Sequence, residues 1–162
     1  MLGVRYLLRW GTITVFVTAF VTLFAAIAVP SARAAPSGEP TVEELKGRLT
    51  SASIGDRAHL CVQIAQKQLV EADKLYAASD AEKGEVALTD VVAYSELARD
   101  YSIQSRKHEK QTEIAARTMI RKLTDLVHSL AHDDQAPVRN AINRLERVRD
   151  DLLKAMFPKG SK

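Results

Sequence analysis

From Glu85 to Ala136 the chain contains neither glycine nor proline, and this stretch constrains the fold more than any other. Glycine and proline are the residues that most often end a helix, so the stretch predicts one long helix. Ser79 and Glu82 match a capping box at its start. We expect the helix to run from about residue 80 to about residue 132. At 1.5 Å per residue it would be about 80 Å long, longer than an ordinary globular helix.

The middle of this stretch is polar. Every residue from Gln104 to Glu113 is polar, so no side of a helix can be buried there without burying charge. The segment is therefore either a solvated bridge in a straight rod or the place where the helix bends. A straight helix would leave two hairpins with uncovered apolar faces and would favour a dimer. A bend would let the chain close as a monomeric four-helix bundle.

Apolar residues recur at spacings of three and four on both sides of this stretch, which predicts further amphipathic helices. We expect a short helix over about 41–50, a second over about 53–78 and a last one over about 138–156. No strand pattern is present. The predicted fold class is all-α: a helical bundle, or extended antiparallel hairpins built on the long central helix (about 80–132), with three main helices and a short N-terminal one.

Residues 1–34 have the order of a signal peptide. Arg5 and Arg9 precede an uncharged, apolar run from Gly11 to Val29, and small residues follow it. Signal peptidase requires small side chains at the first and third positions before the cut, and Ala34 and Ala32 supply them. We therefore expect cleavage between Ala34 and Ala35. An uncleaved N-terminal membrane anchor is the alternative, because about 20 apolar residues can span a bilayer. Under either interpretation the remainder lies outside the cytoplasm. It is periplasmic or secreted in the first case and anchored to the inner membrane in the second.

The rest of the chain divides into three parts. Residues 35–40 have the composition of a flexible linker, residues 41–157 are expected to form a single helical domain, and residues 158–162 are a tail. Removing residues 1–34 leaves equal numbers of basic and acidic side chains. The remainder therefore lacks the excess of positive charge that is typical of proteins that bind nucleic acid. Contact with a membrane is expected only through the N-terminal segment, if it stays uncleaved.

Cys61 is the only cysteine of the chain. It excludes an intramolecular disulfide and the cysteine pair that attaches a c-type haem. Its neighbours at helical spacing are Ala58 and Ala65, which predicts a buried thiol acting as a small hydrophobic side chain. The alternative is a disulfide between two copies, because exported proteins meet an oxidising environment.

Asp125, His128 and His132 are the nearest approach to a binding site. On a continuous helix they would share one face, and histidines four residues apart can bind zinc, copper or nickel. This face points away from the apolar stripe and lies beside Arg117 and Arg121, which disfavour a cation. A solvated helix face is therefore the simpler interpretation. No catalytic constellation, phosphate-binding loop or cofactor motif is found, so we expect neither enzymatic activity nor a cofactor.

These patterns predict an exported helical protein that works by interaction. It would act as a scaffold or a chaperone-like module, bind a protein partner, and self-associate as a homodimer. We expect the interface where the apolar faces of the second and long helices remain uncovered, at Ile64, Leu75, Tyr94 and Leu97. The alternative is a metal- or small-ligand-binding bundle that uses Asp125, His128 and His132.

Overall fold

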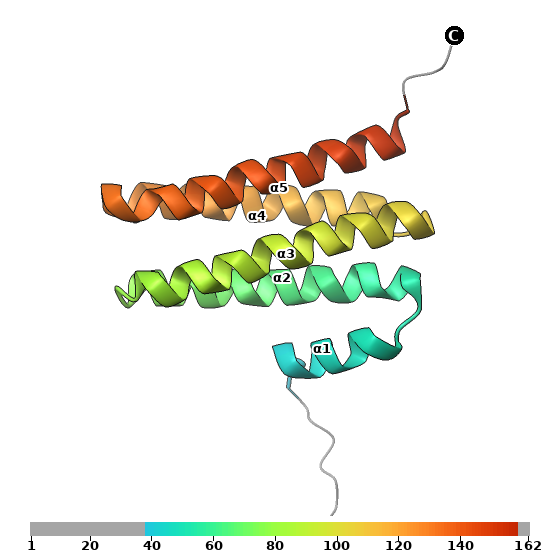
Figure 1. The fold of residues 1–162 in the computed structure, drawn as a ribbon, viewed down its shortest axis with the longest axis horizontal. Coiled ribbons are helices and arrows are strands. Elements are labelled where there is room, and N and C mark those ends of the chain that lie inside the picture. Colours follow the sequence, from blue (N-terminus) through green and yellow to red (C-terminus); the bar gives the residue numbers. More distant parts are fainter. Residues whose placement is uncertain (1–37, 159–162) are drawn as a thin grey trace, which may run out of the picture. The chain divides into compact units, whose positions relative to one another are not determined.

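The computed structural model describes residues 38–158, and every regular element in this range is a helix (Figure 1). The all-α fold class is thereby confirmed, and no strand occurs among these residues. The predicted signal peptide, the cleavage site between Ala34 and Ala35, the first part of the linker and most of the tail lie outside the described residues. Within residues 38–158, no helix combines the length and the apolar character needed to cross a membrane.

The first two helices begin at side-chain caps. α1 (Val42–Ser51) follows Thr41, whose hydroxyl accepts the backbone N–H of Glu44, while the Glu44 carboxylate accepts the backbone N–H of Thr41. α2 (Ile54–Ala77) follows Ser53, whose hydroxyl accepts a backbone N–H three residues further on. These caps satisfy N–H groups that have no partner inside a helix, which is why the helices begin where they do.

The single long helix predicted for residues 80–132 is wrong, because the structure divides it in two. α3 (Ala81–Ser105) and α4 (Glu109–Ser129) are separated by a short break in which Arg106 and His108 are left-handed, with φ of 56° and 64°. The break falls inside the polar segment that the sequence identifies as a place where the helix would bend. Residues 38–158 therefore hold four long helices and the short α1, instead of three and a short one.

The second hairpin is closed by a short turn. α4 ends at Ser129, after which Leu130 is extended, with φ of −90° and ψ of 150°. A 3₁₀ turn, η1 (His132–Asp134), then leads directly into α5 (Gln135–Met156). Pro137 lies in the first turn of α5, where its missing N–H removes no hydrogen bond from the helix.

The four long helices form two hairpins, α2 with α3 and α4 with α5, that pack on each other (Figure 1). α3 lies beside α5, and α2 lies beside α4. Two ion pairs show that α3 and α5 run parallel. Glu96 pairs with Arg144, and Arg99 pairs with Asp151 further along both helices. The chain therefore reverses direction at the break between α3 and α4.

The main hydrophobic core lies between all four long helices. Leu69 of α2, Val91 of α3, Leu123 of α4 and Leu145 of α5 are buried in it. Removal of apolar surface from water is the main force that holds such helices together, at about 25 cal/mol per Å². Burial of these side chains therefore holds the two hairpins together.

Candidate functional site

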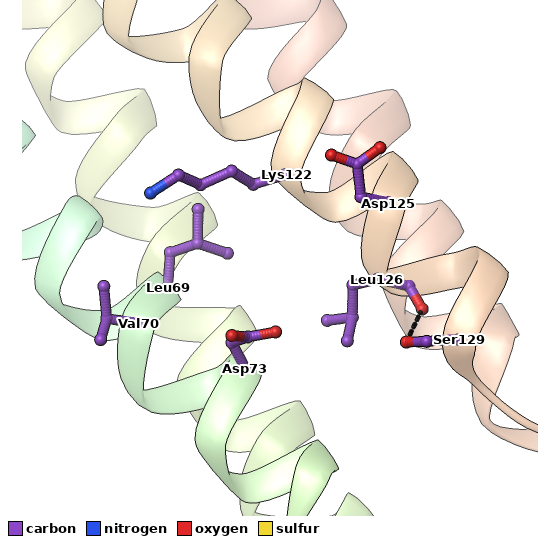
Figure 2. A pocket seen from close by; sticks show the side chains of 7 residues that line it. All are labelled: Leu69, Val70, Asp73, Lys122, Asp125, Leu126 and Ser129. Atoms are coloured by element: carbon purple, nitrogen blue, oxygen red, sulfur yellow. Dashed lines mark hydrogen bonds between the residues drawn. The ribbon is translucent and has the colours of Figure 1, made fainter.

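A groove of about 360 Å³ lies between α2 and α4 (Figure 2). Leu69 and Leu126 line it and are buried, whereas Val70 is 47% exposed. The other side chains that line the groove are polar: Asp73, Lys122, Asp125 and Ser129. Apolar surface with a few polar groups around it is the usual composition of a surface that binds another molecule.

Two carboxylates give this groove its charge. Asp73 comes from α2 and Asp125 from α4, and neither forms an ion pair within residues 38–158. Lys122 extends from α4 toward α2 in Figure 2 but pairs with neither of them. The groove thus offers two negative charges to a partner, against one positive charge.

The structure separates the three residues predicted to bind a metal. Asp125 lines the groove between α2 and α4, whereas His128 lines a different hollow, between α4 and α5. His132 lies in η1, beyond the end of α4 at Ser129. Within residues 38–158, no group of three or more His, Cys, Asp or Glu side chains is arranged to hold a metal ion. Asp125, His128 and His132 therefore do not share one continuous helix, because α4 ends at Ser129 and His132 lies in η1.

Two other histidines do come together. His59 of α2 and His108, which precedes α4, have ring centroids 5.9 Å apart. They line a hollow of about 380 Å³, together with Arg48 and Asp56. Two imidazoles are fewer ligands than zinc sites in proteins use. Sequence reasoning missed this pair because the two residues are distant in the chain and meet only if the helix breaks beside His108.

Helix α1 covers part of the surface that was predicted to be an interface. Ile64 is fully buried against Leu45 of α1, and Tyr94 is partly buried against the same small core. Leu75 is partly buried against the main core. Leu97 alone among the four predicted residues is exposed, at 39%. For Ile64, α1 therefore provides within the chain the cover that a second molecule was expected to provide, and the interface stays a prediction.

Cys61 is fully buried, and this burial raises the pKa of its thiol from 9.0 to about 11. The positive charge of Arg57 favours the thiolate and opposes the shift, but its effect is smaller. A disulfide with a second copy needs the sulfur at the surface and its thiolate form. The burial of Cys61 therefore agrees with its interpretation as a small hydrophobic side chain, whereas the predicted disulfide between two copies would require this sulfur to become exposed.

Comparison with known proteins gives no assignment. No family model, curated protein or solved structure matches this chain. The function is therefore inferred from the groove, its charges and the way the helices pack.

Proposed function

We propose that this chain is an exported helical protein that acts by binding another protein, and that the groove between α2 and α4 receives a helix of that partner. The sequence of residues 1–34 supports the export. The groove supports the binding, because it joins buried apolar side chains to the exposed Val70 along the seam between two helices. An amphipathic helix that lays its apolar face into such a seam is a recurring mode of protein recognition.

The charges of the groove indicate the chemistry of the partner. Asp73 comes from α2 and Asp125 from α4, the two helices that form the groove, and both lack ion pairs within residues 38–158. A partner helix that carries an apolar side chain with Lys or Arg one turn to either side would bring bases to both carboxylates. Because the pairs would lie at a partly exposed rim, they would contribute more to selectivity than to affinity.

A synthetic amphipathic helix of leucine and lysine is a suitable probe. Binding to the purified exported protein is measured by fluorescence anisotropy at low and at physiological salt. We expect Val70→Asp to abolish binding. We expect Asp73→Asn and Asp125→Asn each to weaken it several-fold and to reduce its dependence on salt, because exposed charges are screened.

Three controls make the result specific to the groove. Glu146→Gln removes an acid from α5, and Leu97→Asp changes the exposed residue of the interface predicted from sequence; neither should alter binding. A peptide of leucine and glutamate should bind much more weakly. Equal losses for Glu146→Gln and Asp125→Asn, or unchanged binding in Val70→Asp, would show that the groove is not the binding surface.

A further inference from the structure

The break between α3 and α4 is not required by the local sequence. Arg106 and His108 adopt left-handed backbone conformations, which residues with a Cβ disfavour. No glycine or proline occurs between Glu85 and Ala136. Since the same residues would extend a helix without strain, the break persists because contacts between distant parts of the chain favour it.

Those contacts join the segment before the break to the segment after it. We call residues 38–105, which contain α1 to α3, the N-terminal half, and residues 109–158, which contain α4, η1 and α5, the C-terminal half. The buried hydroxyls of Ser102 and Thr112 are hydrogen-bonded at 2.8 Å across the break. Arg144 of α5 donates three hydrogen bonds to the Glu96 carboxylate of α3, at 2.8 to 3.0 Å. None of these contacts requires both halves to belong to one chain.

The two halves also carry opposite net charge. The N-terminal half contains seven Lys and Arg residues against twelve Asp and Glu, a formal charge of −5. Counted from Arg106, which includes the break, the segment to Pro158 contains eleven bases against eight acids, a formal charge of +3. Each half thus attracts the other, whether the other half is supplied by the same chain or by another, and two halves of the same kind repel.

We propose that a second copy of this chain is a partner, and that the two copies exchange their C-terminal halves. α3 and α4 straighten into one helix from Ala81 to Ser129, about 74 Å long at 1.5 Å per residue. The C-terminal half of each copy then packs on the N-terminal half of the other. Domain exchange of this kind is favoured where a short hinge is strained.

The directions of the helices permit this exchange. The chain reverses between α3 and α4, so the two helices run antiparallel in the closed form. Two straightened helices related by a two-fold axis are also antiparallel. The N-terminal half of one copy and the C-terminal half of the other can therefore form the same contacts that the two halves form within the monomer. The exchanged dimer lacks the left-handed residues and gains helical hydrogen bonds at the hinge, whereas the monomer avoids the entropy loss of association. The balance therefore depends on protein concentration. This inference does not rest on the groove that we propose as the binding surface.

A charge exchange between Glu96 and Arg144 tests the proposal. Glu96→Arg and Arg144→Glu, made in separate chains, each place like charges between α3 and α5. The two variants are unfolded, mixed, refolded at high concentration and examined by native mass spectrometry. In an exchanged heterodimer one unit holds both substituted residues and the other holds the native pair, so we expect the heterodimer to exceed either homodimer at least tenfold. A statistical mixture, or monomers alone, would overturn the proposal. Both substitutions in one chain give the folding control.

Hinge variants supply an independent readout. Arg106→Gly with His108→Gly relieves the strain of the break and should lower the dimer fraction at a given concentration, measured by sedimentation velocity. Arg106→Ala with His108→Ala favours a continuous helix and should raise the fraction several-fold. Equal fractions in the two variants would contradict the proposal. Asp73→Asn, which weakens the proposed groove, should leave both fractions unchanged and so separates the two hypotheses.

Discussion

The ring of Tyr76, near the end of α2, lies against Gly84, in the first turns of α3, so closely that position 84 has no room for a side chain. A Cβ on Gly84 would lie 2.8 Å from Cε2 of Tyr76 and 2.9 Å from its Cδ2. The ring is buried, and its hydroxyl oxygen has no hydrogen-bond partner within residues 38–158. The glycine therefore permits the close approach of α2 and α3 beside their connecting turn.

Gly84→Ala should destabilise the protein, although alanine is the better helix former. The gain in helix propensity is about 1 kcal/mol, but crowding of a well-packed ring costs about 1 to 3 kcal/mol. Gly47→Ala is the matched control, because a Cβ built there meets no atom within 4 Å apart from its own chain neighbours and the nearby backbone of its helix. It should stabilise the protein by about 0.5 to 1 kcal/mol. Urea denaturation of both variants measures the difference. A stabilised Gly84→Ala would mean that the Tyr76 ring is not held in place.

Glu113 and Arg117 of α4 form an ion pair in which the acid is buried and the base is exposed. The Glu113 side chain is 4% exposed and that of Arg117 is 59% exposed, and one guanidinium nitrogen lies 2.6 Å from both carboxylate oxygens. Arg117→Ala leaves the carboxylate without this partner, so we expect the melting temperature to fall by several degrees. Adding Glu113→Gln should recover most of the loss. Arg121→Ala, at an exposed arginine of the same helix, is the control, and an equal fall there would contradict the prediction.

Stability should fall at alkaline pH because of Cys61. Its pKa is raised from 9.0 to about 11 in the folded chain, so the folded state favours the neutral thiol. This contribution is fully present below pH 9 and is lost as the pH rises through 11, a change of about 2 to 3 kcal/mol. Cys61→Ala should show a smaller fall between pH 8 and 11 when unfolding by urea is followed. Tyr76, whose pKa burial also raises, acts in the same direction and accounts for a residual fall. Parallel curves for the two proteins would contradict the prediction.

The export signal leads to a prediction about the mature N-terminus. If signal peptidase cleaves after Ala34, N-terminal sequencing of the exported protein should begin at Ala35, and Ala34→Arg should leave the leader attached, because the position before the cut needs a small side chain. Met1 at the N-terminus of the membrane fraction would favour the uncleaved anchor instead.

Local signals in the sequence predicted the helices well. The predicted starts of the helices near residues 41, 53 and 80 agree with the observed ones to within one residue, although Asp80 caps α3 in place of the predicted Ser79. The stripes around Leu69, Leu123 and Leu145 follow helical spacing and are buried. Such features depend on neighbours in the chain, which is why they can be inferred without a structure.

The sequence failed to predict features that depend on contacts between residues distant in the chain. The polar segment from Gln104 to Glu113 permitted either a straight or a broken helix. Packing of α3 beside α5 favoured the break, with left-handed residues that no local signal marks. The same break brought His59 to His108, and the end of α4 at Ser129 separated His132 from Asp125 and His128.

The sequence by itself determined an all-helical chain with capped helices, one cysteine without an intramolecular partner and a leader that predicts export. Only the tertiary structure decided that α1 covers Ile64 and that the groove opens between α2 and α4. The physical reason is that helix formation depends on residues within a turn of each other. The covering of one apolar face by another depends instead on which helices meet, and here the packing of the four long helices favours the break between α3 and α4.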